Sequence, residues 1–124
     1  MPTPPQISDS EWNVMKIVWE AGPLTAGQIV QRMVGQSDWH PRTIKTLLSR
    51  LVKKGAVAME EDGKRYLYRA KDTREACRRY ETRSFLSRVF DGAVAPALVH
   101  FLKQSDLSRE ELEELKRILE REGR

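Results

Sequence analysis

Apolar residues recur at helical spacing in short segments near the start of the chain. The capping-box pattern Ser8–Glu11 precedes the first segment, which predicts a helix from Asp9 until Gly22-Pro23 interrupts the spacing. A second capping box, Thr25–Gln28, predicts another helix that runs to about Val34. In both patterns the side chains satisfy backbone amides that a helix start would otherwise leave unpaired.

A third amphipathic helix and a hairpin follow. Pro41 suits the first position of the helix, Gly55 suits its C-terminal cap, and the apolar stripe between them consists of Ile44, Leu47, Leu48, Leu51 and Val52. Two strand-like runs, Ala56–Glu61 and Arg65–Ala70, are joined around Asp62-Gly63, a dipeptide typical of tight hairpin turns. Three helices followed by a hairpin predict a winged helix-turn-helix over Ile7–Ala70.

The tail from Lys71 carries three more helical patterns: Asp72–Phe90, Pro96–Lys103 and a segment that begins at a third capping box, Ser108–Glu111. Each has a one-sided apolar face and is too short to be stable alone, which favours pairing with a second copy. The predicted fold is mainly α with a small β-hairpin wing, with a winged helix-turn-helix domain over 7–70 and an α-helical dimerisation domain over 71–124. The predicted dimerisation residues are Tyr80, Phe85, Leu86, Val89, Phe90, Leu98, Phe101, Leu102, Leu112, Leu115 and Leu119.

Charge adds a candidate partner. The net charge is +4, and residues 37–55, with five basic residues and one acidic residue, account for all of it. The face of the third helix opposite the apolar stripe carries Arg42, Thr43, Lys45, Thr46, Ser49, Arg50 and Lys53. Arginine and threonine can read base edges and lysine neutralises phosphate, so we expect double-stranded DNA here, with Arg42, Thr43 and Thr46 on the bases. A solvated helix face has the same composition, but the adjoining hairpin favours DNA.

Four further residues are candidates for phosphate or minor-groove contact. Lys64 and Arg65 flank the predicted turn of the wing, with Arg69 as a weaker candidate, although charges on an edge strand also discourage aggregation. His40 precedes the third helix, where it can contact a phosphate or cap the helix.

The aromatic side chains have a structural interpretation. Trp12, Trp19 and Trp39 lie in apolar stripes or beside helix starts, and Tyr66 and Tyr68 alternate on one strand, so we expect them to pack in the core rather than stack on bases.

The sequence contains no signature of catalysis or of metal binding. Cys77 is the single cysteine, and neither His40 nor His100 has partners at metal-ligand spacing, so we expect neither an enzyme nor a bound cofactor. Nearby arginines could lower the pKa of Cys77 and make it a redox sensor, but a structural role is favoured. The start, Met1–Gln6, has no apolar signal core and Gly92–Leu102 is too short to span a bilayer, which predicts a soluble cytoplasmic protein without membrane insertion.

Three segments of the sequence resemble the penicillinase repressor family, BlaI/MecI. They are ISDSEWNVMKIVWEAGPLTAGQIV, DWHPRTIKTLLSRLVKKGAV and RYLYRA. The resemblance is dense over Ile7–Ala70 and looser across the tail, and the order, spacing and length agree from end to end. The resemblance implies a homodimeric repressor on a palindromic operator, with the third helix of each subunit in the major groove and interlocked tail helices. It argues against copper sensing, because the copper-responsive relatives end in a cysteine-rich motif, whereas this sequence ends in LEREGR.

The resemblance also implies a route to derepression. In the best-known members a membrane sensor of β-lactam antibiotics is linked to a protease, which cleaves an Asn-Phe bond in the dimerisation domain and releases the operator. The matching bond here is His100-Phe101, where histidine departs from the family pattern. Two alternatives stay open: a repressor that responds to a small molecule bound between the winged helix and the tail, and a winged helix that binds protein and not DNA.

Overall fold

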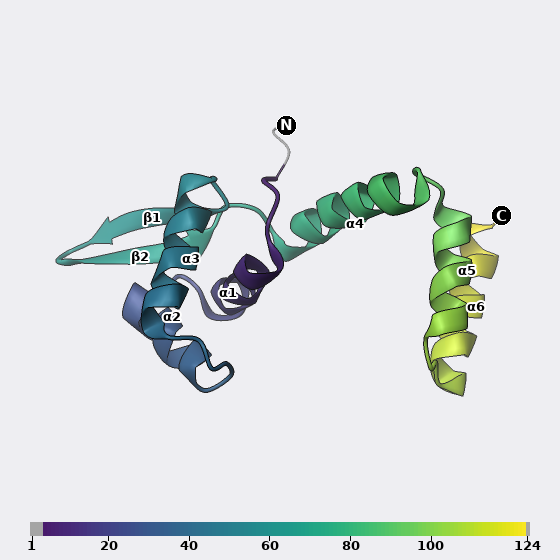
Figure 1. Ribbon diagram of the computed structural model, residues 1–124, viewed down its shortest axis with the longest axis horizontal. Coiled ribbons are helices and arrows are strands. Elements are labelled where there is room, and N and C mark those ends of the chain that lie inside the picture. Colours follow the sequence, from purple (N-terminus) through teal and green to yellow (C-terminus); the bar gives the residue numbers. More distant parts are fainter. Residues whose placement is uncertain (1–3, 124) are drawn as a thin grey trace. The chain divides into compact units, whose positions relative to one another are not determined.

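The computed structural model describes residues 4–123, so Met1–Thr3 of the proline-rich start and Arg124 of the expected tail domain lie outside it. The chain contains six helices and one hairpin over the described residues, which confirms the mainly α fold with a small wing (Figure 1). In chain order the elements are α1 (Asp9–Ala21), α2 (Ala26–Val34), α3 (Pro41–Lys53), β1 (Val57–Asp62), β2 (Arg65–Ala70), α4 (Arg74–Phe90), α5 (Val94–Gln104) and α6 (Arg109–Glu122).

Capping boxes begin three of the helices, as the sequence predicts. At α1 the Ser8 hydroxyl accepts from the Glu11 amide at 3.2 Å, and the Glu11 carboxylate accepts from the Ser8 amide at 2.9 Å. Thr25 and Gln28 make the same reciprocal pair before α2, and a third box, Ser108–Glu111, precedes α6. The helix starts were predictable because both partners of each box lie within one turn of the chain.

The first strand of the hairpin begins and ends one residue later than the sequence predicts. β1 begins at Val57, and Asp62 pairs with Arg65, so the two-residue loop is Gly63-Lys64 rather than Asp62-Gly63. Gly63 has a φ of +66°, a conformation that disfavours any residue with a Cβ atom. The register is therefore set by the glycine, which takes the first position of the loop.

A single backbone bridge joins the wing to the loop between α1 and α2. The Leu24 amide donates to the Tyr68 carbonyl at 3.1 Å, and the Tyr68 amide donates to the Leu24 carbonyl at 2.7 Å. This bridge holds β2 against the helices on the side away from β1. The sequence did not predict it, because one residue has no strand periodicity.

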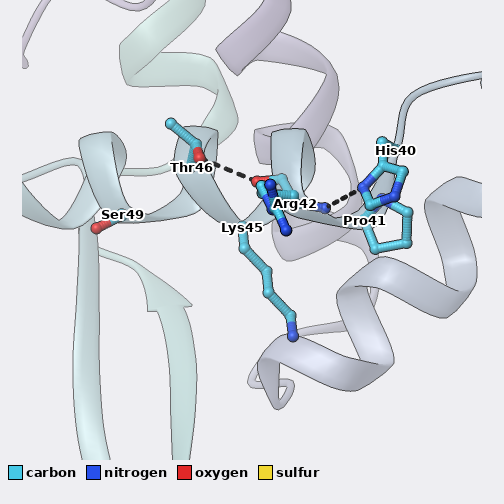
Figure 2. Close-up of a pocket in the computed structure, with 6 residues that line it drawn as sticks. All are labelled: His40, Pro41, Arg42, Lys45, Thr46 and Ser49. Carbon is cyan, nitrogen blue, oxygen red and sulfur yellow. Dashed lines mark hydrogen bonds between the residues drawn. The ribbon is translucent and has the colours of Figure 1, made fainter.

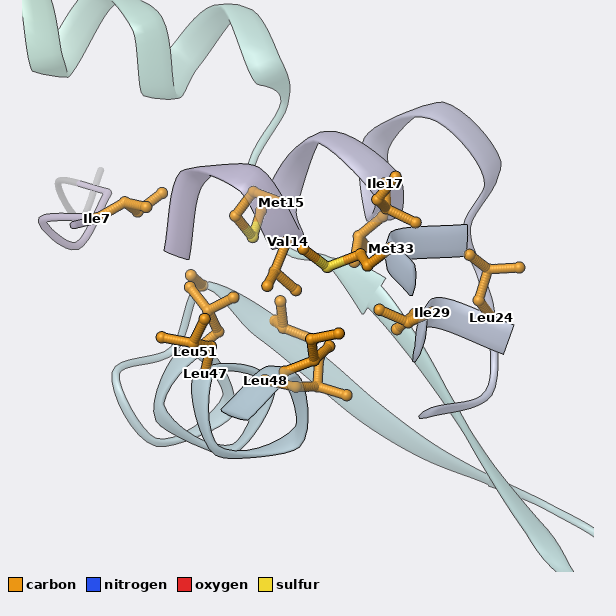
Figure 3. Close-up of a cluster of buried hydrophobic side chains, with 14 of the residues drawn as sticks. Ile7, Val14, Met15, Ile17, Leu24, Ile29, Met33, Leu47, Leu48 and Leu51 are labelled. Atoms are coloured by element: carbon orange, nitrogen blue, oxygen red, sulfur yellow. The ribbon is translucent and has the colours of Figure 1, made fainter. Parts of the chain in front are cut away.

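The core lies where α1, α2, α3 and the base of the hairpin meet (Figure 3). Its larger buried side chains are Ile7, Val14, Met15, Ile17, Val18, Leu24, Ile29, Met33, Ile44, Leu47, Leu48, Leu51 and Val57. Trp12, Trp19, Trp39 and Tyr68 pack at its edge, which confirms their structural interpretation. The prediction for Tyr66 was wrong: this side chain is 48% exposed, because it pairs with Glu61 towards the tip of the hairpin, away from the core.

The chain forms two compact units, and their boundary falls inside α4. The N-terminal unit ends at Thr82 and the C-terminal unit begins at Arg83, twelve residues beyond the boundary expected between residues 70 and 71. The first turns of α4 belong to the N-terminal unit because Cys77 is buried in its core. Helix α4 starts at Arg74, two residues later than expected, because Thr73 caps it through a 3.0 Å bond from the Ala76 amide.

The C-terminal unit comprises the end of α4 together with α5 and α6. Helix α5 starts at Val94, two residues earlier than expected, since Pro96 is tolerated in the first turn, where its missing amide has no intrahelical partner. Over residues 4–123, no single helix is long and apolar enough to cross a membrane, although α4 and α5, which are separated by a 90° bend, are long and apolar enough when taken together.

Candidate nucleic-acid interface

Helix α3 separates its apolar and polar side chains onto opposite faces. Ile44, Leu48 and Leu51 are buried against α1 and α2. The structure brings the polar positions predicted on this helix to one exposed face, and they are Arg42, Thr43, Lys45, Thr46, Ser49, Arg50 and Lys53. The separation follows from the helical period, which places residues three or four apart on the same side.

The N-terminal turn of α3 is fixed by its own side chains (Figure 2). The His40 Nδ1 atom accepts from the Arg42 amide at 3.1 Å, and Pro41 takes the first helical position, so His40 is the N-cap. The Thr46 hydroxyl donates to the Arg42 carbonyl at 2.9 Å. That bond uses the hydroxyl hydrogen and leaves the Thr46 oxygen lone pairs and methyl group for an external partner.

A shallow hollow runs along this part of the helix. It measures about 490 Å³ and is lined by His40, Pro41, Arg42, Lys45, Thr46 and Ser49. The Arg42 and Lys45 side chains reach it from the exposed face, so it offers a guanidinium, an ammonium and hydroxyl oxygens to one ligand surface. Such a mixture suits an anionic ligand that also presents hydrogen-bond donors and acceptors.

The C-terminal end of α3 is tied to α1 by an ion pair that the sequence did not predict. The Lys54 Nζ atom lies 2.6 Å from the Glu11 carboxylate and also donates to the Gln6 carbonyl at 3.0 Å. Glu11 is 2% exposed. Burial raises the pKa of this carboxyl, but hydrogen bonds from Lys54 and Ser8 outweigh the effect and hold the pKa below its usual value.

The wing carries its cations beside carboxylates. The Arg65 guanidinium lies 3.1 Å from the Asp62 carboxylate across the loop, and Arg69 pairs with Glu60 across the two strands. Lys64 stands exposed in the loop itself. Lys64 and Arg65 therefore lie together at the tip of the wing, where Asp62 neutralises part of their charge.

Large apolar side chains stand exposed on the C-terminal unit. Among the predicted dimerisation residues, those exposed by 41–56% are Val89, Leu98, Phe101, Leu102, Leu112 and Leu119, whereas Tyr80, Phe85, Leu86, Phe90 and Leu115 are half-buried. Tyr80 belongs to the N-terminal unit, so it is not part of the apolar surface of the C-terminal unit. Val94 and Val99 are exposed as well and were not predicted, although Val94 stands one helical turn before Leu98.

Aromatic rings join the end of α4 to α5. The Phe101 ring stacks on Phe85 with centroids 6.1 Å apart, and it meets Phe90 edge-on at 6.4 Å. His100 lies 5.9 Å from the Phe90 ring. The His100-Phe101 bond, expected to be a cleavage point, is thus inside a helix whose side chains help to hold this unit together.

Cys77 is a buried core residue, 3% exposed. Burial, with a smaller contribution from Asp72, raises the pKa of its thiol, opposite to the lowered value that a redox sensor would need. The structure therefore supports the structural interpretation. In the part of the chain that is described, no three His, Cys, Asp or Glu side chains are grouped so that they could hold a metal ion.

Comparisons with known proteins identify similar sequences along nearly the whole chain. A family described as penicillinase repressor matches residues 7–121. The chain is 35% identical to the penicillinase repressor of Bacillus licheniformis, over 94% of this chain and 91% of that protein. It is 36% identical to the methicillin resistance regulatory protein MecI of Staphylococcus aureus (strain N315), over 92% and 93%.

A solved structure matches the N-terminal part. It is the solution structure of monomeric Bacillus licheniformis BlaI in complex with the blaP half-operator, with a TM-score of 0.55 and 34% identity. The match covers 61% of this chain and 93% of the BlaI chain.

Proposed function

The chain belongs to the penicillinase repressor family and is a DNA-binding transcriptional repressor, and we propose that it binds a palindromic operator as a homodimer through α3 and the wing. The observation that supports this most is the face of α3, where every polar position predicted from the sequence is exposed on one side. A helix of this kind fits the major groove of B-DNA.

The residues of this face divide between base reading and phosphate contact. Arg42, Thr43 and Thr46 occupy the first turns of α3, the part of a recognition helix that reaches base edges. Arginine can bond guanine through two donors, and a threonine methyl can contact thymine. Lys45, Arg50, Lys53, Lys64 and Arg65 surround them and supply charge for the phosphates, and His40 can offer its Nε2 hydrogen to a phosphate oxygen.

The C-terminal unit supplies the second half of the mechanism. Its exposed apolar side chains would be covered by the same surface of a second copy, which gives a dimer with two recognition helices. Two half-sites about 34 Å apart, or a multiple of that distance, would then be bound together, so dimerisation raises affinity through effective concentration.

Derepression would follow from loss of that dimer. A protease linked to a membrane sensor could act at His100-Phe101, as in the antibiotic-resistance regulators that the chain resembles. Both residues are exposed but helical, so α5 would have to open locally before the bond could enter a protease.

The first experiment separates base reading from phosphate contact. Duplexes selected from a randomised library, and scrambled versions of them, are titrated with the full chain at several salt concentrations. The Arg42→Ala variant should lose about 1–3 kcal/mol on the selected duplex and little on the scrambled one. The control, Lys53→Ala, should weaken both equally and reduce the salt slope by about one.

Equal, weak binding of the wild type to selected and scrambled duplexes would contradict operator recognition. That outcome would favour the alternative in which the winged helix binds protein. An Arg42→Ala variant that weakens both duplexes equally would show instead that Arg42 contacts only the backbone.

A further inference from the structure

Trp19, in the last turn of α1, contacts the chain immediately before α4. Its indole Nε1 atom donates to the Asp72 carbonyl at 3.0 Å, a contact between residues 53 positions apart. The Trp19 ring also packs against Trp12, with ring centroids 5.4 Å apart in an edge-to-face arrangement. Trp19 therefore joins the first helix of the N-terminal unit to the start of α4.

Arg74, the first residue of α4, makes a second connection to the same place. Its guanidinium carbon lies 5.5 Å from the centre of the Trp19 ring, and one of its nitrogens lies 3.6 Å from the Glu20 carboxylate. A planar guanidinium over an indole is attracted by the ring electrons and restricts the direction of both side chains. Trp19 and Arg74 thus attach the first turn of α4 to the last turn of α1.

Two further contacts complete the attachment of residues 71–77. The Lys71 amide donates to the Ala56 carbonyl at 3.0 Å, just before β1, and Cys77 is buried in the core one turn into α4. The start of α4 is held to α1, to the base of the wing and to the core. From there α4 continues without a break to Phe90, in the unit proposed to dimerise.

We propose that Trp19 and Arg74 are positioning residues that determine which spacing between half-sites the repressor accepts, an inference that rests on the proposed binding of a palindrome by a homodimer. A dimer with a stiff connection places its second recognition helix at one spacing, which raises the effective concentration there and lowers it elsewhere. A loosened α4 would spread the second helix over several spacings. Neither residue belongs to the proposed DNA-contacting face, so binding to one half-site should not depend on them.

The experiment measures affinity of the full chain for three duplexes built from the selected half-site: a single copy, the inverted pair at the preferred spacing, and the pair with two base pairs inserted. The insertion rotates one half-site by roughly 70° and moves it by about 7 Å. Trp19→Phe removes the indole donor and keeps an aromatic ring, and Arg74→Met removes the guanidinium and keeps the stem. Arg79→Met, an exposed arginine on the same helix, is the control.

The wild type and Arg79→Met should bind the preferred spacing at least about tenfold more tightly than the altered one. Both Trp19→Phe and Arg74→Met should reduce this ratio to less than about threefold, with unchanged affinity for the single half-site. Variants that keep the wild-type ratio would overturn the inference, as would an equal loss on all three duplexes, which indicates a purely structural role. A wild type that binds the pair no better than one half-site would refute the proposed dimeric function, independently of the variants.

Discussion

Glu11 is a single residue with two structural roles. Its carboxylate completes the capping box at the start of α1 and also forms the ion pair with Lys54 at the end of α3. A buried carboxylate is costly unless it is paired and hydrogen-bonded, and Glu11 has both kinds of partner. Lys54 also donates to the Gln6 carbonyl, so its ammonium group holds the chain before α1 against the end of α3.

Glu11→Gln should lower the free energy of unfolding by about 2 kcal/mol at neutral pH, since it leaves Lys54 without its anionic partner. Folding lowers the pKa of Glu11 below the usual 4.5, so its contribution is present above that value and is lost as pH falls through the lower folded pKa. Urea unfolding between about pH 7 and pH 3 should therefore show a weaker acid dependence in the variant than in the wild type.

The control for this prediction is Glu111→Gln, which alters the capping box of α6, where the carboxylate is exposed. It should cost less than Glu11→Gln. If Glu11→Gln were as stable as the wild type at neutral pH, the pair with Lys54 would contribute nothing to the fold.

At the scale of one element, the hairpin shows how charge is balanced within the interface. Residues 60–65 contain three carboxylates and two cations, and Asp62 lies against Arg65 at the tip. An exposed pair of this kind contributes little to stability, so its main effect is on the charge that the wing presents. The carboxylates would reduce the attraction of the wing to any phosphate, whatever the DNA sequence.

Asp62→Asn should therefore raise affinity for DNA by about two- to fivefold, to a similar extent on selected and scrambled duplexes, with a steeper salt dependence. Fluorescence-anisotropy titrations at several salt concentrations would measure this. Asp106→Asn removes the same charge from the C-terminal unit and should change affinity much less. Unchanged or weaker binding by Asp62→Asn would show that the wing does not approach the phosphates.

At the scale of the whole molecule, the two units differ in how much apolar surface they bury. The N-terminal unit has a continuous core, whereas Ala97 is the one buried residue between Arg83 and Gly123. Burial of apolar side chains is the main contribution that offsets the conformational entropy lost on folding. The apolar side chains that this unit leaves exposed support the proposed pairing with a second copy.

Leu119→Glu should convert the protein to a monomer, because it places a charge among these exposed apolar side chains. Sedimentation velocity should show the loss of the dimer, and affinity for paired half-sites should fall at least about tenfold while single half-site binding remains. Arg117→Glu, an exposed polar position on the same helix, should remain dimeric. A dimeric Leu119→Glu variant would show that α6 lies outside the interface.

The sequence predicted most of the helices, the hairpin and the exposed face of α3, because these depend on local patterns. A capping box, a glycine with positive φ or an apolar stripe involves residues within a few positions of one another. The same local logic placed Arg42, Lys45 and Thr46 on one side of a helix. It misplaced Tyr66 because alternation along a strand indicates a face but not how far the core extends along it.

Only the tertiary structure decided which distant residues meet. Glu11 and Lys54 lie 43 positions apart and Trp19 and Asp72 lie 53 apart, and each pair forms because the tertiary fold brings distant segments of the chain together. The same packing buries Cys77 and moves the boundary of the N-terminal unit into α4. The sequence by itself determined the elements and the chemistry of the exposed face of α3, because both follow from neighbours along the chain. How α4 is attached depends on contacts in space, which have no periodicity in the sequence.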